Sequence, residues 1–288
     1  MTVKPLYHSS DLAPAYSLRH TWCGWATSGN LQALNDDEWI ALCNAWQNDY
    51  LHLLERAIDG NKILLTFSTS PVVSPVFLAK RAKGRLGYAL RAANGIGVEF
   101  SRKIAVRSVG ENTTSDVQAY IASQIETEEF VDPRFAEFLE QFTVVDSSVD
   151  LAVPSESRSG RYWYNLHLVL VTDGRTRIVD EAGLETIRDG SGRIAEKKGY
   201  SIAAISVMPD HVHIALRGAI EHSPEEIALA FMNNLSHMLR RGRVWRSGYY
   251  VGTFGEYNMN AIRRLVRAES CSPARRAGRG LAEAGDSI

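Results

Sequence analysis

Two histidines stand one residue apart in the stretch "VMPDHVHIALRG", which runs from Val207 to Gly218. Successive side chains on a β-strand point to opposite faces, so His211 and His213 share one face while Val212 and Ile214 face the core. Two adjacent imidazoles on a rigid strand can form part of a metal site. Two polar residues on a half-solvated strand would have the same spacing, and the spacing alone favours that simpler interpretation.

The composition is that of a soluble globular protein. The chain has 288 residues, of which 45% are hydrophobic and 23% are charged, and this length accommodates two domains. No apolar run approaches the ~20 residues that span a bilayer, and the first residues lack the apolar stretch of a secretory signal. The three cysteines show no ligand spacing. We therefore expect a reduced, cytoplasmic location and no membrane partner.

The charge is distributed unevenly along the chain. The formal net charge is −1, but residues 1–150 carry a net charge of −5 and residues 151–288 carry +4. Two local clusters of basic residues could follow a phosphate backbone, although most charge runs are solvated helix faces. The candidates for nucleic-acid binding are Lys80, Arg81, Lys83, Arg85, Arg240, Arg241, Arg243 and Arg246.

The sequence contains an internal repeat. Three blocks recur in the same order at offsets of 145 or 149 residues. They are Trp25–Asn30 with Leu170–Arg175, Ser74–Arg91 with Ser223–Arg240, and Ser108–Gln124 with Thr253–Glu269. The shared order predicts two homologous halves, joined by a flexible Ser-rich linker at Val144–Gly160.

We place the first half at residues 1–147, the second at 148–270 and a disordered tail at 271–288. Each half is predicted to alternate strands and helices, with helices of the second half at 181–198, 223–241 and 260–269. The "Ser-Pro" that opens two of the repeat blocks is a helix start, with serine as the N-cap. We expect the α+β class, with two ferredoxin-like antiparallel-sheet sandwich domains in tandem.

The second half, over residues 162–269, resembles the HUH single-tyrosine transposases of insertion sequences and related enzymes that process palindromic repeats. The resemblance rests on "YNLHLVLVTDGR", "VMPDHVHIAL", "VWRSGYYVGTFGE" and "NAIRRLVRAES". It implies that His211 and His213 hold a divalent metal, and that a tyrosine on the last helix attacks DNA to leave a 5′-phosphotyrosine. A glutamine one turn later would complete the metal site. Such enzymes are dimers in which this helix can serve the partner's histidines.

The second half departs from this pattern on its last helix. Leu265 occupies the place of the tyrosine and Glu269 that of the glutamine. The repeat places Tyr120 and Gln124 of the first half opposite these two residues, and their i, i+4 spacing puts them on one helix face.

The histidine positions show the converse loss. At the offset of 149 residues, Lys62 and Leu64 of the first half stand opposite His211 and His213. Neither an ammonium group nor a leucine side chain has a lone pair for a metal. We therefore predict one composite site, with Tyr120 as the nucleophile and His211, His213 and Gln124 as metal ligands. Such nitrogen and oxygen donors suit Mg²⁺ or Mn²⁺.

Two functions are consistent with these residues. The first is a metal-dependent endonuclease and strand transferase acting on single-stranded or hairpin DNA, as a monomer that forms an intramolecular pseudo-dimer; higher oligomers remain open. The alternative is an inactive descendant that binds hairpin or single-stranded DNA, or RNA, as a regulator.

Individual residues also have simpler interpretations. The Tyr120 ring could pack in the core, which is a common position for a helix tyrosine. His167 is interpreted as structural and Asp210 as a residue of the strand entry. The aromatic residues Trp245, Tyr249 and Tyr250 are suited equally to base stacking and to the core.

Overall fold

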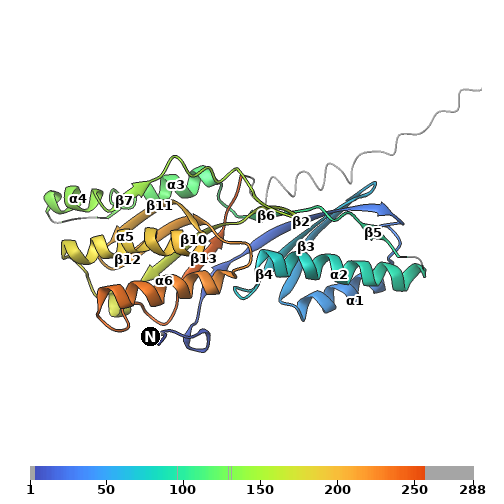
Figure 1. The fold of residues 1–288 in the computed structure, drawn as a ribbon, viewed down its shortest axis with the longest axis horizontal. Helices are drawn as coiled ribbons and strands as arrows, with labels where there is room; N and C mark the ends of the chain where they lie inside the picture. The colour runs from blue at the N-terminus through green and yellow to red at the C-terminus, as the bar shows by residue number, and fades with distance from the viewer. Residues whose placement is uncertain (1–3, 96, 129, 131, 257–288) are drawn as a thin grey trace, which may run out of the picture.

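The computed structural model describes residues 4–256 apart from positions 96, 129 and 131. Within this part of the chain the protein is a mixed α+β fold with two sheets side by side (Figure 1), which confirms the predicted class. The helices are α1 (Asp36–Gln47), α2 (Pro75–Asn94), α3 (Thr114–Ala122), α4 (Pro133–Glu140), α5 (Glu181–Lys198) and α6 (Pro224–Leu239). Short 3-10 turns lie at Ser9–Asp11 and Asp173–Arg175. None of the described helices is long and apolar enough to cross a membrane.

The first sheet has the strand order β3-β4-β2-β6-β9-β8, and β5 also pairs with β2. Its strands are β2 (Arg19–Ser28), β3 (Leu51–Asp59), β4 (Lys62–Thr69), β5 (Glu99–Phe100), β6 (Ile104–Val109), β8 (Ser155–Ser157) and β9 (Gly160–Trp163). The second sheet has the order β1-β13-β10-β12-β11-β7. Its strands are β1 (Ala15–Ser17), β7 (Thr143–Val145), β10 (Asn165–Val171), β11 (Ser201–Met208), β12 (His211–Arg217) and β13 (Tyr250–Thr253).

The predicted helix starts are found in the structure. Ser74 and Ser223 are the N-caps of α2 and α6, and each is followed by proline in the first turn. Each serine hydroxyl accepts a hydrogen bond from the backbone N–H three residues later, which satisfies a donor that would otherwise lack a partner. The predicted helix at 260–269 and the predicted tail lie outside the described residues.

Helices cover the two sheets unequally. Apolar residues of α1 and α2 pack on one face of the first sheet, and those of α5 and α6 pack on one face of the second. Helix α3 lies on the opposite face of the second sheet, against β7, β11 and β12 (Figure 1). The second sheet is therefore enclosed between α5 and α6 on one side and α3, from the first half, on the other.

Each half contributes a strand to the sheet of the other half. Strand β1, near the start of the chain, pairs in parallel with β13 of the second sheet. Strand β9, which stands 145 residues after β1, pairs in parallel with β6 of the first sheet. Strand β13 is the last described strand of the second half, and β6 is the last strand that the first half contributes to the first sheet. Neither sheet is therefore built from one side of the predicted boundary at residue 147.

A second set of contacts is also reciprocal. The Ser108 hydroxyl donates to the carbonyl of Phe254, and the Thr253 hydroxyl donates to the carbonyl of Val109, at 2.8 and 2.7 Å. At this crossing Gly110 and Gly255 allow close backbone approach. A Cβ at Gly110 would lie 2.3 Å from the Thr253 oxygen, and one at Gly255 would lie 2.5 Å from the Ser108 oxygen. Each contact thus occurs twice, with the halves interchanged.

The Ser-rich segment differs from the flexible linker that composition predicts. It contains the end of β7 and all of β8, and Leu151 within it is buried against Val117 and Ile121 of α3. The Leu151 carbonyl also accepts a hydrogen bond from the Asn165 side chain. Burial of one leucine is enough to override the local preference of serine and aspartate for open turns.

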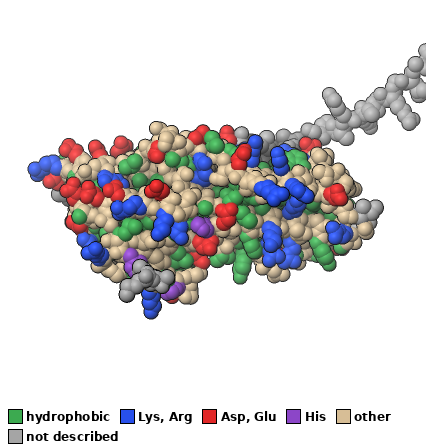
Figure 2. All heavy atoms as spheres, in the orientation of Figure 1, with side chains coloured by type: hydrophobic (Ala, Val, Ile, Leu, Met, Phe, Trp, Pro, Cys, Tyr) green, Lys and Arg blue, Asp and Glu red, His purple; other side chains and the backbone are tan. Residues whose placement is uncertain are grey.

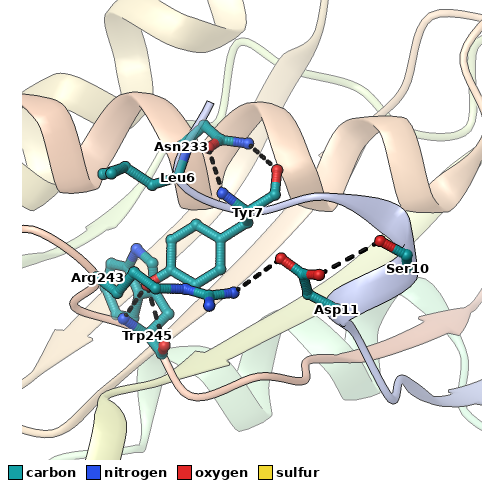
Figure 3. Close-up of polar contacts among 7 residues, drawn as sticks. All are labelled: Leu6, Tyr7, Ser10, Asp11, Asn233, Arg243 and Trp245. Carbon is teal, nitrogen blue, oxygen red and sulfur yellow. Dashed lines mark hydrogen bonds and ion pairs between the residues drawn. The ribbon is translucent and has the colours of Figure 1, made fainter. Parts of the chain in front are cut away.

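The N-terminal segment is fastened to the second half (Figure 3). The Tyr7 ring is buried, and its hydroxyl donates to the Trp245 carbonyl and accepts from the Trp245 N–H. The Asn233 side chain of α6 accepts from the backbone N–H of Tyr7 and donates to the Tyr7 carbonyl. The Arg243 guanidinium lies 4.8 Å from the Tyr7 ring centroid. These contacts position the start of the chain so that β1 reaches β13.

Candidate active site

Helix α3 carries Tyr120 and is fixed at its start. The Thr113 side chain accepts from the Asp116 N–H while the Asp116 carboxylate accepts from the Thr113 N–H, which forms a capping box. Val117 and Ile121 are buried in a small cluster with alanines 203, 204 and 215 of the second sheet. Because alanine side chains are short, the helix can approach this sheet closely. Tyr120 is on the same helix but remains 50% exposed.

The Tyr120 ring lies beside the histidines of the second sheet. Its centroid is 5.5 Å from that of His213 and 6.0 Å from that of His167, in edge-on geometry at both rings. The His211 and His213 rings are 5.0 Å apart. The structure thus brings Tyr120 to His213 and His167, and the alternative in which its ring packs in the core does not hold.

His213 forms a hydrogen bond with His167 that sequence reasoning missed. The His167 Nε2 and His213 Nδ1 atoms are 3.0 Å apart, and the two rings are stacked. Burial lowers the pKa of His213 to about 3, aided by the neighbouring His167 and His211, and burial lowers the pKa of His167 to about 4. Both rings are therefore neutral at pH 7, and each carries a single N–H. When His213 is the donor, its Nε2 keeps a lone pair.

His211 is oriented by the residue before it. Its Nδ1 is 2.7 Å from the Asp210 carboxylate, which also accepts from Arg175 at 3.0 Å. Burial acts to raise the pKa of Asp210, but the hydrogen bonds from His211 and Arg175 outweigh it and lower the pKa below its usual value. Asp210 is thus an ionised acceptor, and the His211 Nε2 is left for another partner. The signal in the sequence was a carboxylate directly adjacent to the histidine.

Gln124 lies just beyond the C-cap of α3, four residues after Tyr120, and is buried. Its Nε2 donates to the Tyr120 carbonyl at 2.9 Å, so its Oε1 is the atom available to a metal. Among the described residues no three histidine, cysteine, aspartate or glutamate side chains are grouped to hold a metal ion. Two imidazoles and one amide oxygen leave coordination positions for phosphate oxygens and water, so the donor set fits Mg²⁺ or Mn²⁺ better than structural zinc.

The three aromatic residues near the end of the second half separate into two groups. Trp245 and Tyr249 are buried in the core, and burial raises the pKa of Tyr249. Tyr250 is partly exposed, and its ring centroid is 6.0 Å from that of His167. Tyr250 is therefore the second tyrosine at the histidine cluster.

At the positions of the histidines, the repeat predicts other residue types in the first sheet. Strand pairing is similar in both sheets, as the following pairs show. On β2 and β4, Trp25 pairs with Lys62 and Cys23 pairs with Leu64. On β10 and β12, Val171 pairs with His211 and Val169 pairs with His213. These pairs correspond when Trp25 is set opposite Val171, an offset of 146 residues, whereas the repeat sets Trp25 opposite Leu170 at 145. The assignment of Lys62 and Leu64 to the positions of the histidines stays a prediction. Leu265 and Glu269 lie outside the described residues.

Most of the basic candidates for nucleic-acid binding form contacts within the chain. Arg81 and Arg85 both pair with Asp49, and Lys83 donates to the Ser101 carbonyl. In the second cluster, Arg241 pairs with Asp180 and Arg243 with Asp11. The residues left exposed without a described ion pair are Lys80, Arg240 and Arg246. Figure 2 shows Lys and Arg side chains interspersed with Asp and Glu on the viewed face, without one continuous basic surface.

Part of the second half is similar to a known family of proteins. Residues 161–269 match the family model described as "Transposase IS200 like". This region, and not the chain as a whole, is similar to the IS200-like transposases. The ISDra2 transposase TnpA of Deinococcus radiodurans is 24% identical over 131 residues, which cover 41% of this chain and 94% of that protein.

Two solved structures are also similar. One is the 1.90 Å crystal structure of a candidate transposase from Deinococcus radiodurans R1, with 22% identity and a TM-score of 0.30, covering 36% of this chain and 89% of that one. The other is a REP-associated tyrosine transposase bound to a REP hairpin, with 12% identity and a TM-score of 0.30. It covers 36% of this chain and 62% of that one.

Proposed function

We propose that this protein is a metal-dependent endonuclease and strand transferase that acts on hairpin-bearing single-stranded DNA through a 5′-phosphotyrosine intermediate. The observation that carries the proposal is the proximity of Tyr120 to His213, whose ring centroids are 5.5 Å apart. Tyr120 precedes the histidine pair by about ninety residues and comes from the other half of the chain. The nucleophile and the metal ligands of the family pattern are thus divided between the halves.

The active unit is a single chain that forms an intramolecular pseudo-dimer of residues 1–147 and 148–270. The reciprocal strand exchange and the reciprocal hydrogen bonds of Ser108 and Thr253 support this arrangement, because two copies of one fold related by a pseudo-twofold axis repeat each contact. The repeat in the sequence supports an origin by duplication.

The metal ligands in this proposal are the Nε2 atoms of His211 and His213 and the Oε1 atom of Gln124. The hydrogen bonds from His211 to Asp210 and between His213 and His167 support it, because a ligating imidazole usually donates its other N–H to a fixed acceptor. In this tautomer His167 accepts from His213. When bound, Mg²⁺ or Mn²⁺ supplies positive charge that favours phenolate character and offsets charge on the phosphoryl oxygens.

In the proposed reaction the Tyr120 Oη attacks the scissile phosphorus. The bond from phosphorus to the 3′ oxygen breaks as the bond from Oη to phosphorus forms, and the departing 3′ oxygen takes a proton from water. This leaves a 3′-OH and a 5′-phosphotyrosine. The phenol proton passes to water, because the half-exposed Tyr120 side chain is in contact with solvent. Attack by a 3′-OH on the same phosphorus joins the strands and releases the Tyr120 phenol.

The direct test is incubation of the protein with Mn²⁺ and a library of single-stranded hairpins, followed by detection of covalent protein–DNA adducts on denaturing gels. We expect adducts with the wild-type protein and none with Tyr120→Phe, which should still bind DNA within about twofold because phenylalanine keeps the ring. Tyr88→Phe is the matched control, since Tyr88 is exposed on α2.

Each outcome identifies a different function. An adduct with Tyr120→Phe would place the nucleophile elsewhere, with Tyr250 as the next candidate because it adjoins His167. DNA or RNA binding by the wild-type protein without any adduct would favour the alternative function, an inactive descendant that binds hairpins or single strands as a regulator.

A further inference from the structure

A cavity of about 360 Å³ opens on the first sheet, on the face away from α1 and α2. Trp22 and Ala26 of β2 pack beneath those helices, so Trp25, of opposite parity, points to the other face. Its lining includes Trp25, Lys103, Glu156, Arg161 and Trp163. The volume is near the lower end of the ~300–1,000 Å³ range of small-ligand sites. Because β8 and β9 come from beyond residue 147, the walls of the cavity come from both halves.

Two tryptophans line this cavity, and one of them is held in place. The Trp163 indole N–H donates to the Ala152 carbonyl at 2.6 Å, and the Arg107 guanidinium lies 3.6 Å from the ring centroid. Trp25 and Trp163 are both only partly buried, so each indole keeps some surface in contact with solvent. A fixed, partly exposed indole is the kind of surface on which an unpaired base stacks.

The charges at the cavity suit a phosphate. Lys103 is exposed and forms no ion pair with any residue that the structure describes. Arg161 pairs with Glu156 at 3.0 Å, but both side chains are more than half exposed, so the pair contributes little stability. Arg161 can therefore exchange this partner for a phosphate, whose oxygens match the guanidinium fork.

We propose that this cavity binds one unpaired nucleotide of single-stranded DNA, with its base against Trp25 or Trp163 and its phosphate at Lys103 and Arg161. The inference rests on the proposed function, which supplies single-stranded DNA as the substrate. The lining of the cavity includes neither Tyr120 nor a histidine, so the nucleotide site is separate from the site at Tyr120. The first half thus contributes substrate affinity on the sheet that lacks the histidine pair.

The test measures binding alone, without metal. A fluorescein-labelled single-stranded oligonucleotide is titrated with the full-length protein in EDTA, and fluorescence anisotropy gives Kd. We expect Trp25→Ala to raise Kd about tenfold, which is the effect of losing one stacked base. Lys103→Glu should raise Kd several-fold and weaken its salt dependence. Tyr88→Ala and Lys197→Glu, both at exposed helix positions, serve as the aromatic and charge-matched controls.

A photochemical measurement identifies the contact. Strands in which single thymines are replaced by 5-iodouracil should cross-link at one position to a peptide containing Trp25 or Trp163. Values of Kd within about twofold of wild type for both Trp25→Ala and Lys103→Glu would overturn the proposal, as would cross-links only from a duplex stem. Lys103→Glu keeps the test valid if Trp25→Ala fails to fold, because Lys103 is exposed. Failure of the proposed nicking activity appears separately, as the absence of adducts with Mn²⁺.

Discussion

Strands β12 and β4 occupy the same place in the two sheets but carry different chemistry. Their inward residues are alike, since Val212 and Ile214 of β12 are as fully buried as Ile63 and Leu65 of β4. Their outward residues differ, with the histidine pair on β12 and a lysine and a leucine on β4. The comparison teaches that the scaffold and its chemistry can change independently, because the core residues specify the sheet while the outward residues specify what it binds.

The strongest test of this comparison substitutes equivalent residues of the two strands. His211→Ala should lower Mn²⁺-dependent adduct formation by more than about a hundredfold, because a metal ligand is lost outright. Lys62→Ala, 149 residues earlier on β4, should leave the rate within about twofold. Rates are measured from the time course of adducts on denaturing gels. Equal losses from the two substitutions would mean that the first sheet also takes part in the chemistry.

A mixing experiment tests whether the site forms within one chain. Tyr120→Phe and His211→Ala each remove one necessary part, so a mixture regains activity only if halves of different chains combine. The strand exchange and the buried Leu151 hold the halves together, and a covalent connection gives an effective concentration in the millimolar range. We expect no adducts from the mixture at micromolar protein. Recovered activity would identify the working unit as a dimer of two chains.

The sequence predicted local features well because their signals are local. Ser74 and Ser223 mark helix starts through hydrogen bonds to residues three positions away. The alternation along β4 and β12 is also local: Ile63 and Leu65, like Val212 and Ile214, are buried, so Lys62 and Leu64 lie on the outward face, as the histidine pair does.

Features that depend on packing between the halves were not predicted. Strands β1 and β9 are short, and only the docking of the halves selects their partners. The contact between His167 and His213 depends on which strands are neighbours, so neither residue reveals it. Predicting that Tyr120 lies beside His213 required the repeat and the family resemblance together, since the sequence of α3 by itself resembles that of any amphipathic helix.

The substitution Asp210→Asn should have a smaller effect than the loss of a histidine. The residue at the equivalent position of the first half is Asn61, whose amide donates to the Ala26 carbonyl, so Asp210→Asn makes β12 more like β4. Asparagine can still accept from His211, but it lacks the negative charge that raises the basicity of the ring. We expect Mn²⁺ affinity, measured by calorimetry on the DNA-free protein, to fall about tenfold. An unchanged affinity would mean that Asp210 serves only the ion pair with Arg175.

The smallest expected difference lies at the backbone crossing, where the two halves should behave alike. Gly110→Ala and Gly255→Ala each place a methyl group against a backbone oxygen of the other half, at 2.3 and 2.5 Å before any relaxation. Overpacking of this kind costs about 1–3 kcal/mol, which corresponds to several degrees in Tm for a chain of this size. Gly84→Ala is the control, since a Cβ there meets nothing within 4 Å and alanine favours the helix α2.

Thermal unfolding followed by circular dichroism should therefore give similar decreases in Tm for Gly110→Ala and Gly255→Ala, and an unchanged or higher Tm for Gly84→Ala. The two decreases should agree within about 2 °C, because the two crossings have the same geometry with the halves interchanged. A large loss at one glycine only would show that one crossing carries the interface between the halves. In that case the halves would differ in structure as well as in chemistry, and the proposed pseudo-twofold relation would not extend to the energetics of the fold.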